Sequence, residues 1–327
     1  MYDHGFLRSL VLAGSALVVF GLLFASFAHE YWELIVTQGL MVGLGGGLLF
    51  LPGLLGLSSH FHSRLALAQG IATSGGSLGG VIYPIVFSQL QPMIGFGWAT
   101  RIIALIAASS LVIPAACMKK PPKTRERHPS LDLSAWRDAS YSLFALAIFL
   151  GFVGFYVPYY YVQAYSSEKV AMSKSLAFYL LPILNAGAFF GRILPNLLVG
   201  FFGPLNTLIP FTITSATIAL LFTFCRTTPS VIIFCALYGF FSSPLMSLVP
   251  NVVSKLCSKT DSFGTRLGML FIPMSLGYLI GDPIAGIILG AGWVPLQVFC
   301  ASTLLACAAV MLAVRVRLQG WTLTQPI

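Results

Sequence analysis

Long apolar segments dominate this chain of 327 residues and leave few folds open to it. Apolar residues make up 57% of the sequence and charged residues only 8%, whereas about 25% of the residues in a soluble domain are charged. Each of ten segments is long enough to cross about 30 Å of hydrocarbon. They span approximately 7–28, 34–57, 66–90, 98–117, 140–164, 174–198, 205–225, 229–250, 265–290 and 293–314. The sequence therefore predicts an all-α polytopic membrane protein.

A repeat with a spacing of 198 residues runs through these segments. The matched pairs are Gly5 and Gly203, Pro52 and Pro250, and, one residue late, Pro84 and Pro283. A Ser-Leu-Gly triplet also precedes both prolines of the last pair. Two related apolar halves are typical of secondary transporters, so the repeat predicts two pseudo-repeated helical halves.

A polar linker, residues 119–139, separates the two predicted halves. The amino-terminal half, residues 1–118, holds four apolar segments, and the carboxy-terminal half, residues 140–327, holds six. Subtracting the repeat spacing from Ser140 gives a position about 58 residues before Met1, which is room for about two spans of 20 residues. We therefore expect ten of twelve transmembrane helices, with the first two missing.

The positive charge of the chain fits a membrane topology better than a nucleic-acid interface. The net charge is +9, but the basic residues lie in the linker or flank apolar segments, with no basic stripe interleaved with aromatics. We expect no nucleic-acid partner. If both termini are cytoplasmic, 14 of the 18 Lys and Arg residues lie inside. The exceptions are Arg101, Lys169, Lys174 and Arg226. This distribution predicts that both termini lie in the cytoplasm, and we expect an integral protein of the plasma membrane.

No constellation of catalytic or metal-binding residues stands out in the sequence. The six cysteines lie in or beside apolar segments without a CxxC pair, and the nine acidic residues are mostly spread over loops. His60 and His62 make a poor metal site without further ligands. We expect no enzymatic activity, no cofactor and no metal.

Glycines spaced four residues apart recur in the apolar segments. They are Gly43 with Gly47, Gly187 with Gly191, and Gly277 with Gly281, and the run from Gly75 to Gly80 contains overlapping pairs of small residues. Such spacings let helix backbones approach closely in a membrane. No strand precedes them, so helix packing is favoured over phosphate binding.

Several motifs taken together point to one family. In the first half they are Gln38-Gly39, Gly43-Leu44-Gly45, Pro52, Phe61, Arg64, Gly70-Ile71-Ala72, Gly79-Gly80, Pro84 and residues 94–101. In the second half they are Leu181-Pro182-Ile183-Leu184-Asn185, Gly191-Arg192-Ile193, Gly203 and Asn206. Nearly the whole chain thereby resembles the monocarboxylate porter family of the major facilitator superfamily, most strongly its fungal branch.

The resemblance implies a fold of twelve helices in two halves, around a cavity that opens alternately to each side. It implies a secondary transporter of a small organic solute, monocarboxylate-like or a related metabolite, surrounded by membrane lipid, with protons as a candidate co-substrate. The animal members carry an Asp where this chain has Ala188, and they use a Lys in the first helix that this chain lacks. Efflux of a fungal secondary metabolite is therefore an alternative, and a truncated, non-transporting membrane protein is another. The oligomeric state stays open.

The segment at the amino terminus is similar to the loop that the superfamily carries between its second and third helices. Its candidate conformational residues are Asp3, Gly5 and Arg8, and Arg64 joins them from a later cytoplasmic turn. The resemblance implies that these residues act in the exchange between conformations rather than in contact with solute.

Arg192 and Asp282 are the charged candidates for substrate binding or gating inside apolar segments. Arg192 is either an anion-binding or gating charge in the cavity wall, or a side chain that extends toward the cytoplasmic surface. Asp282 is a proton site or gate residue, or it caps a local helix break before Pro283. At 1.5 Å per residue the two lie roughly 9 Å and roughly 26 Å from the cytoplasmic ends of their helices, so we expect no salt bridge between them.

Polar and aromatic residues supply the remaining candidates. Tyr156, Tyr160 and Gln163 recur at positions i, i+4 and i+7, so they share one helical face. Such a face suits a planar, partly aromatic ligand, or it belongs to an aromatic belt at the outer interface. Asn185 at mid-span is either a ligand contact or an interhelical hydrogen-bonding residue.

Overall fold

The computed structural model describes residues 7–61, 64–117, 132–257 and 263–320. Asp3 and Gly5 lie outside the described residues. Throughout the described ranges the regular secondary structure is helical, and nine helical stretches are long and apolar enough to cross a membrane. The expected all-α membrane fold is confirmed.

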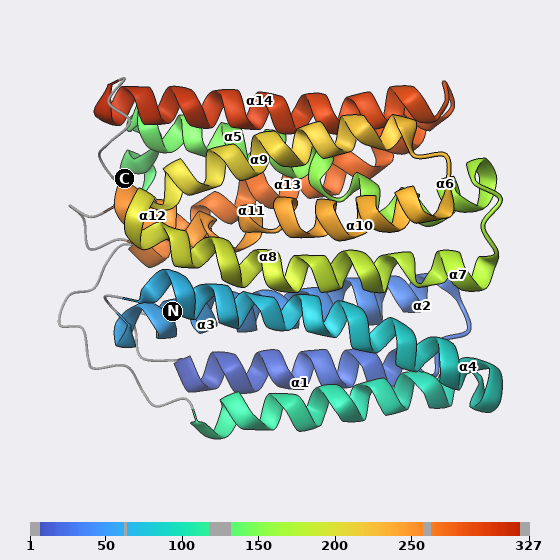
Figure 1. Cartoon of the computed structure of the whole chain (residues 1–327). Coiled ribbons are helices and arrows are strands. Elements are labelled where there is room, and N and C mark those ends of the chain that lie inside the picture. Colours follow the sequence, from blue (N-terminus) through green and yellow to red (C-terminus); the bar gives the residue numbers. More distant parts are fainter. Residues whose placement is uncertain (1–6, 62–63, 118–131, 258–262, 321–327) are drawn as a thin grey trace. The chain divides into compact units, whose positions relative to one another are not determined.

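The helices follow the predicted apolar segments closely (Figure 1). Up to the linker they are α1 (Leu7–Ala25), α2 (Tyr31–Leu34), a π-helix (Ile35–Val42), α3 (Gly43–His60) and α4 (Leu65–Cys117). After it come a 3₁₀-helix (Leu133–Arg137), α5 (Ala139–Phe155), α6 (Val157–Lys169), α7 (Lys174–Phe178), α8 (Leu180–Phe202), α9 (Pro204–Leu221), a 3₁₀-turn (Phe222–Phe224), α10 (Thr228–Ser242), α11 (Pro244–Ser247), α12 (Val249–Leu256), α13 (Phe263–Leu289) and α14 (Trp293–Gln319).

The nine stretches correspond to the ten expected segments because α4 is long enough for two. It runs for 53 residues with one non-helical position, Gly95, at φ 78°. Only glycine adopts this left-handed geometry readily, so Gly95 marks the boundary between the segments expected at 66–90 and 98–117. Gly292, at φ 117°, lies at nearly the corresponding position of the repeat, directly before α14.

The helix bounds reproduce the repeat seen in the sequence. Helix α1 begins at Leu7 and α9 at Pro204, while α4 begins at Leu65 and α13 at Phe263. In each pair, the two helix starts are thus separated by nearly the same 198 residues as the matched prolines. The spacing reflects two series of helices with the same order and similar lengths.

The chain divides into two compact units. One comprises residues 1–63 with 82–130, and the other residues 64–81 with 131–327. The first part of α4 therefore packs with the carboxy-terminal helices. The division of the chain at the 119–139 linker stays a prediction.

Helix α5 lies at the core of the carboxy-terminal unit, where it packs against α13 and α14 (Figure 1). Its side chains Tyr141, Phe144, Ile148 and Phe155 are fully buried. Helix α14 also packs against α9, and α8 packs against α10. The apolar character of α5 on all sides explains its central place, since a helix that is hydrophobic all round is buried on all sides.

Glycine allows the closest of these helix contacts. A Cβ at Gly187 or Gly191 on α8 would collide with the carbonyl oxygen of Ala236 or Phe240 on α10. The packing predicted for this pair is therefore confirmed. Gly43 and Gly47 differ, because a Cβ at either would meet no described atom within 4 Å. The packing role predicted for that pair is wrong within the described structure.

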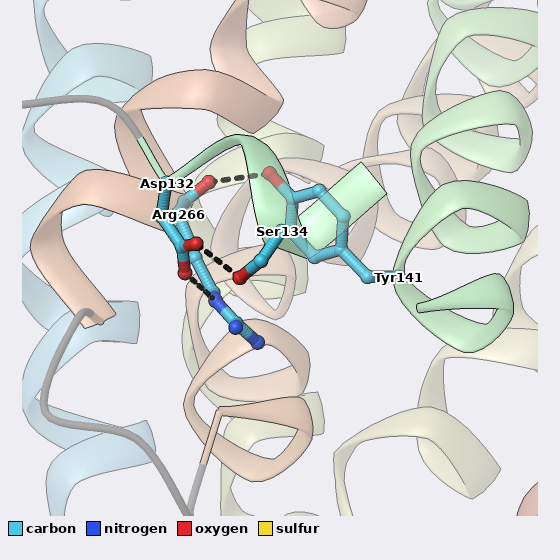
Figure 2. A network of polar contacts seen from close by, with 4 residues as sticks. All are labelled: Asp132, Ser134, Tyr141 and Arg266. Atoms are coloured by element: carbon cyan, nitrogen blue, oxygen red, sulfur yellow. Dashed lines mark hydrogen bonds and ion pairs between the residues drawn. The ribbon is translucent and has the colours of Figure 1, made fainter. Parts of the chain in front are cut away.

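A polar network joins the end of the predicted linker to the start of α13 (Figure 2). Arg266 donates through Nε to Oδ2 of Asp132 at 2.8 Å, and Ser134 donates to the other carboxylate oxygen. The hydroxyl group of Tyr141 donates to the carbonyl oxygen of Arg266 at 2.7 Å. The end of the linker thus packs as part of the carboxy-terminal unit.

We expect Asp132→Asn to lower the stability of the protein measurably, by about 2 kcal/mol, because it leaves the largely buried Arg266 guanidinium without a charged partner. Removing both charges, in Asp132→Asn with Arg266→Met, should restore most of the loss. The exposed pair of Lys169 and Glu168 provides the control, since Glu168→Gln should cost no more than about 1 kcal/mol. Thermal unfolding of the purified variants tests this, and equal effects of Asp132→Asn and Glu168→Gln would contradict it.

Candidate functional site

Arg192 is a buried cation on α8, with 9% of its surface exposed. Its Nη1 atom donates to the carbonyl oxygen of Thr73 at 2.6 Å. The guanidinium group therefore contacts the first part of α4 within the carboxy-terminal unit. The binding or gating role of Arg192 stays a prediction.

The first part of α4 and α8 meet along a seam of small residues. A Cβ at Gly70 would collide with the Arg192 carbonyl oxygen and lie 2.8 Å from Nδ2 of Asn196. A Cβ at Gly76 would lie 3.2 Å from Nη1 of Arg192. Without Cβ atoms at these positions, the backbone of α4 can approach the arginine directly.

Polar atoms without partners surround this seam. Among the described residues, no hydrogen bond reaches Nε of Arg192, either amide atom of Gln69, Oδ1 of Asn196, or the hydroxyls of Tyr159 and Ser242. The last two hydroxyls lie close together without reaching hydrogen-bond geometry. Ser77 also carries an unpaired buried hydroxyl. An unpaired buried polar group costs about 1–3 kcal/mol, so these atoms mark a part of the seam that a bound water molecule or ligand would stabilise.

Tyrosines from the α5–α6 break, from α6 and from α13 form a second group near the arginine. The rings of Tyr156 and Tyr278 lie 4.7 Å apart, and the hydroxyls of Tyr160 and Tyr278 are 2.6 Å apart. Arg192 lies within electrostatic range of Tyr156 and Tyr159. The structure thus links two of the predicted tyrosines to each other and one of them to the predicted arginine.

The shared face predicted for Tyr156, Tyr160 and Gln163 holds only in part. Tyr156 lies in the break between α5 and α6, because Pro158 near the start of α6 has no amide hydrogen to continue the helix from α5. Gln163 donates through Nε2 to the carbonyl oxygen of Phe178 at 3.3 Å. Its amide thus contacts the end of α7 rather than the tyrosine rings.

Asn185 contacts helix backbone rather than other site residues. Its Nδ2 atom donates to the carbonyl oxygen of Leu181 at 3.0 Å. Its Oδ1 atom lies 2.5 Å from where a Cβ of Gly80 would stand. This geometry supports the packing interpretation of Asn185.

Asp282 lies inside α13 and does not cap a helix break. The helix continues through Pro273 and Pro283, so the expectation of a cap is wrong. The hydrogen bonds on either side of a proline can hold a membrane helix together. The carbonyl oxygen of Asp282 accepts from Tyr161 at 3.0 Å, and within the described structure no ion pair joins its carboxylate to Arg192.

The structure describes two of the four predicted conformational-loop residues. Arg8 and Arg64 are exposed at the starts of α1 and α4, and Asp3 and Gly5 fall outside the described residues. In the described ranges, no group of three or more His, Cys, Asp or Glu side chains is arranged to hold a metal ion.

A separate hollow lies in the amino-terminal unit, with a volume of about 230 Å³. It is lined by aromatic and polar side chains at the α1–α2 turn, among them Phe24, Phe27, Trp32 and Glu33. The guanidinium of Arg101 stacks on the Phe27 ring nearby, 4.4 Å from its centroid. Exposed aromatic side chains at a helix end are typical of a membrane interface, so we assign no ligand to this hollow.

The sequence interpretation missed Gln69, Thr73, Asn196 and Tyr278. A weak signal for two of them was present, since Gln69, Thr73 and Ser77 recur every four residues along one helix face. The seam shows that this face is buried. The partner across the seam is distant in sequence, so periodicity alone could not identify it.

Comparison with protein families and comparison with known proteins both identify transporters of the Major Facilitator Superfamily. The family model of the Major Facilitator Superfamily matches residues 3–224. The chain is 37% identical over 318 residues to the MFS-type transporter dbaD of Emericella nidulans, covering 95% of this chain and 71% of that protein. It is 34% identical to the aspyridones efflux protein apdF of the same species, covering 90% of this chain and 61% of that protein.

One more fungal relative and two solved structures also resemble this chain. The agnestins efflux protein AgnL12 of Paecilomyces divaricatus is 31% identical, covering 95% of this chain and 72% of that protein. The human organic anion transporter MFSD10 superposes with a TM-score of 0.78 at 15% identity, covering 93% of this chain and 77% of that one. The E. coli fucose:proton symporter FucP superposes with a TM-score of 0.71 at 19% identity, covering 95% and 85%. At these identities the two structures show a shared fold alone.

Proposed function

Because the chain belongs to the Major Facilitator Superfamily, whose members are transporters rather than enzymes, we propose that it exports a small organic product of fungal secondary metabolism. Relatives named as efflux proteins for aspyridones and agnestins support export. Movement would follow alternating access, in which the solute site opens to one side of the membrane at a time. The chain spans 61% to 72% of the length of the three fungal relatives compared, so the activity of the whole protein is part of this proposal.

We propose an organic anion as the substrate because the guanidinium of Arg192 is buried and lies within electrostatic range of tyrosine side chains. An intramembrane charge is costly to bury and usually has a functional role. A positive charge with aromatic neighbours suits a planar organic anion. This is the chemistry expected of a transporter of the monocarboxylate-porter type. Asp282 is the candidate for proton coupling, since it is the acidic residue deepest within a predicted apolar segment.

Deleting the gene tests the export proposal even while the substrate is unidentified. The deletion strain should accumulate at least one acidic metabolite inside the cells and lose it from the medium. Untargeted mass spectrometry of cells and medium measures both, and expression of the 327-residue chain should reverse the change. An unaltered distribution of every acidic metabolite would contradict the proposal.

We further propose that the protein lies in the plasma membrane. The Lys and Arg distribution supports an orientation with both termini in the cytoplasm. A cysteine at position 30 should react with an impermeant maleimide added to intact cells, because Glu30 lies at the exposed α1–α2 turn. A cysteine at position 125, in the linker and outside the described residues, should react only after permeabilisation. External labelling at position 125 in sealed cells would overturn this orientation.

A further inference from the structure

Resting on the proposed function, we propose that Gln69, Asn196 and Ser242 form a neutral hydrogen-bonding subsite beside Arg192. This subsite would recognise a hydroxyl or N–H donor on the acidic solute. The preferred solute would therefore be a hydroxylated aromatic acid rather than a simple monocarboxylate.

Gln69 is the main evidence for the subsite. Its side chain is fully buried, and neither Nε2 nor Oε1 has a hydrogen-bond partner among the described residues. Gln69 lies one turn before Thr73, whose hydroxyl donates to the Gln69 carbonyl at 2.8 Å. The backbone carbonyl of Thr73 in turn accepts from Arg192. A buried amide without a partner thus lies one helical turn from the residue that holds the guanidinium.

Asn196 contributes an acceptor from the opposite helix. Its Nδ2 atom donates to the Arg192 carbonyl at 2.6 Å and to Oγ of Ser247 at 2.9 Å, which uses both N–H groups. These bonds fix the amide, and its Oδ1 atom is left without a donor in the described structure. Gly70, next to Gln69, lies against the same amide. Gln69 and Asn196 therefore lie at the same level of the α4–α8 seam.

The unpaired atoms define what a ligand must offer. Oε1 of Gln69 and Oδ1 of Asn196 are acceptors only, so a complementary ligand needs an O–H or N–H donor. Nε of Arg192 and Nε2 of Gln69 are donors, so the ligand also needs acceptors. The positive charge of Arg192 disfavours cations and favours an acidic oxygen. An acid without a hydroxyl would leave the amide oxygens unpaired, and sites of this kind reject such analogues strongly.

Ser242 and Tyr159 complete the polar edge toward the tyrosine rings. The hydroxyls of both are buried and unpaired in the described structure, and each can donate or accept. The Tyr159 ring stacks on Phe155 with centroids 5.7 Å apart. The two hydroxyls therefore lie beside an aromatic cluster, which suits a ligand that carries a ring.

The test uses benzoate, 3-hydroxybenzoate and 4-hydroxybenzoate as radiolabelled probes. They share a carboxylate and a ring and differ in one hydroxyl group. Flux is measured in sealed membrane vesicles containing the full chain, and the melting temperature is measured on the purified protein. We expect the wild-type protein to move at least one hydroxybenzoate about tenfold faster than benzoate.

In Gln69→Leu this preference should fall to about twofold or less, because hydroxybenzoate flux should fall more than benzoate flux, while the melting temperature is maintained. Gln91→Leu, at an exposed position of the same helix, should leave the preference unchanged. Ser242→Ala, which removes a single oxygen atom, should reduce the preference and serves as the second variant if Gln69→Leu fails to fold.

The outcomes separate this inference from the proposed function. A wild-type protein that moves all three acids at equal rates, or a preference that survives Gln69→Leu, overturns the subsite alone. A lower melting temperature in Gln69→Leu together with an unchanged preference would assign the amide a structural role with buried water. A wild-type protein that moves none of the three acids contradicts transport of aromatic anions and the subsite with it.

Discussion

Arg192→Ala should reduce transport about a hundredfold or more while leaving the amount of protein in the membrane unchanged. The guanidinium is the buried positive charge that would bind an acidic solute, and its only hydrogen bond in the described structure goes to a backbone carbonyl. Arg192→Lys should recover only part of the activity, because an ammonium group lacks the planar fork that pairs with a carboxylate. Export of the metabolite retained by the deletion strain is the measurement.

Arg226→Ala provides the matched control for this experiment. Arg226 is exposed in the connection between α9 and α10, so its removal should leave export and surface expression as in the wild-type protein. Normal export by Arg192→Ala would contradict the binding role and would support a side chain that extends toward the surface.

Gly191→Leu should prevent folding of most of the protein. A Cβ at this position would collide with the Phe240 carbonyl oxygen and with the Ser243 hydroxyl, so α8 could not keep its distance from α10. Ordinary overpacking costs about 1–3 kcal/mol, and a clash with backbone should reach about 3 kcal/mol or more. Size-exclusion chromatography of the detergent-solubilised protein should show loss of the monodisperse peak.

Gly200→Leu is the control on the same helix, since a Cβ at Gly200 would meet no described atom within 4 Å. It should give a monodisperse peak at close to the wild-type amount. Equal behaviour of Gly191→Leu and Gly200→Leu would show that the α8–α10 contact is looser than the structure indicates.

Much of the fold could be predicted because the membrane constrains a helix by its length and composition. The predicted segment 265–290, for example, corresponds to α13 at Phe263–Leu289. Helix breaks were harder to predict, because proline interrupts the helix at some positions and is accommodated within it at others. The helix stops before Val157 and Pro158, yet it continues through Pro283. Local sequence does not show which prolines neighbouring helices will accommodate.

The candidate site could be predicted only in part. Arg192 stood out because a charge in an apolar segment is rare, and the structure places it in a buried polar cluster. Gln69 and Asn196 did not stand out, because single amides are common in membrane helices and their proximity depends on how α4 packs on α8. The shared face expected for Tyr160 and Gln163 fails for a related reason, since Gln163 contacts the α7–α8 region instead.

Counterflow with the purified chain in liposomes tests the central claim most directly. Vesicles loaded with unlabelled metabolite, the compound retained by the deletion strain, are diluted into a trace of the labelled compound. A transporter with one alternating site should concentrate the label transiently, and Arg192→Ala should abolish the overshoot. Accumulation no greater than in protein-free liposomes would contradict solute transport by this chain and would favour a non-transporting membrane protein.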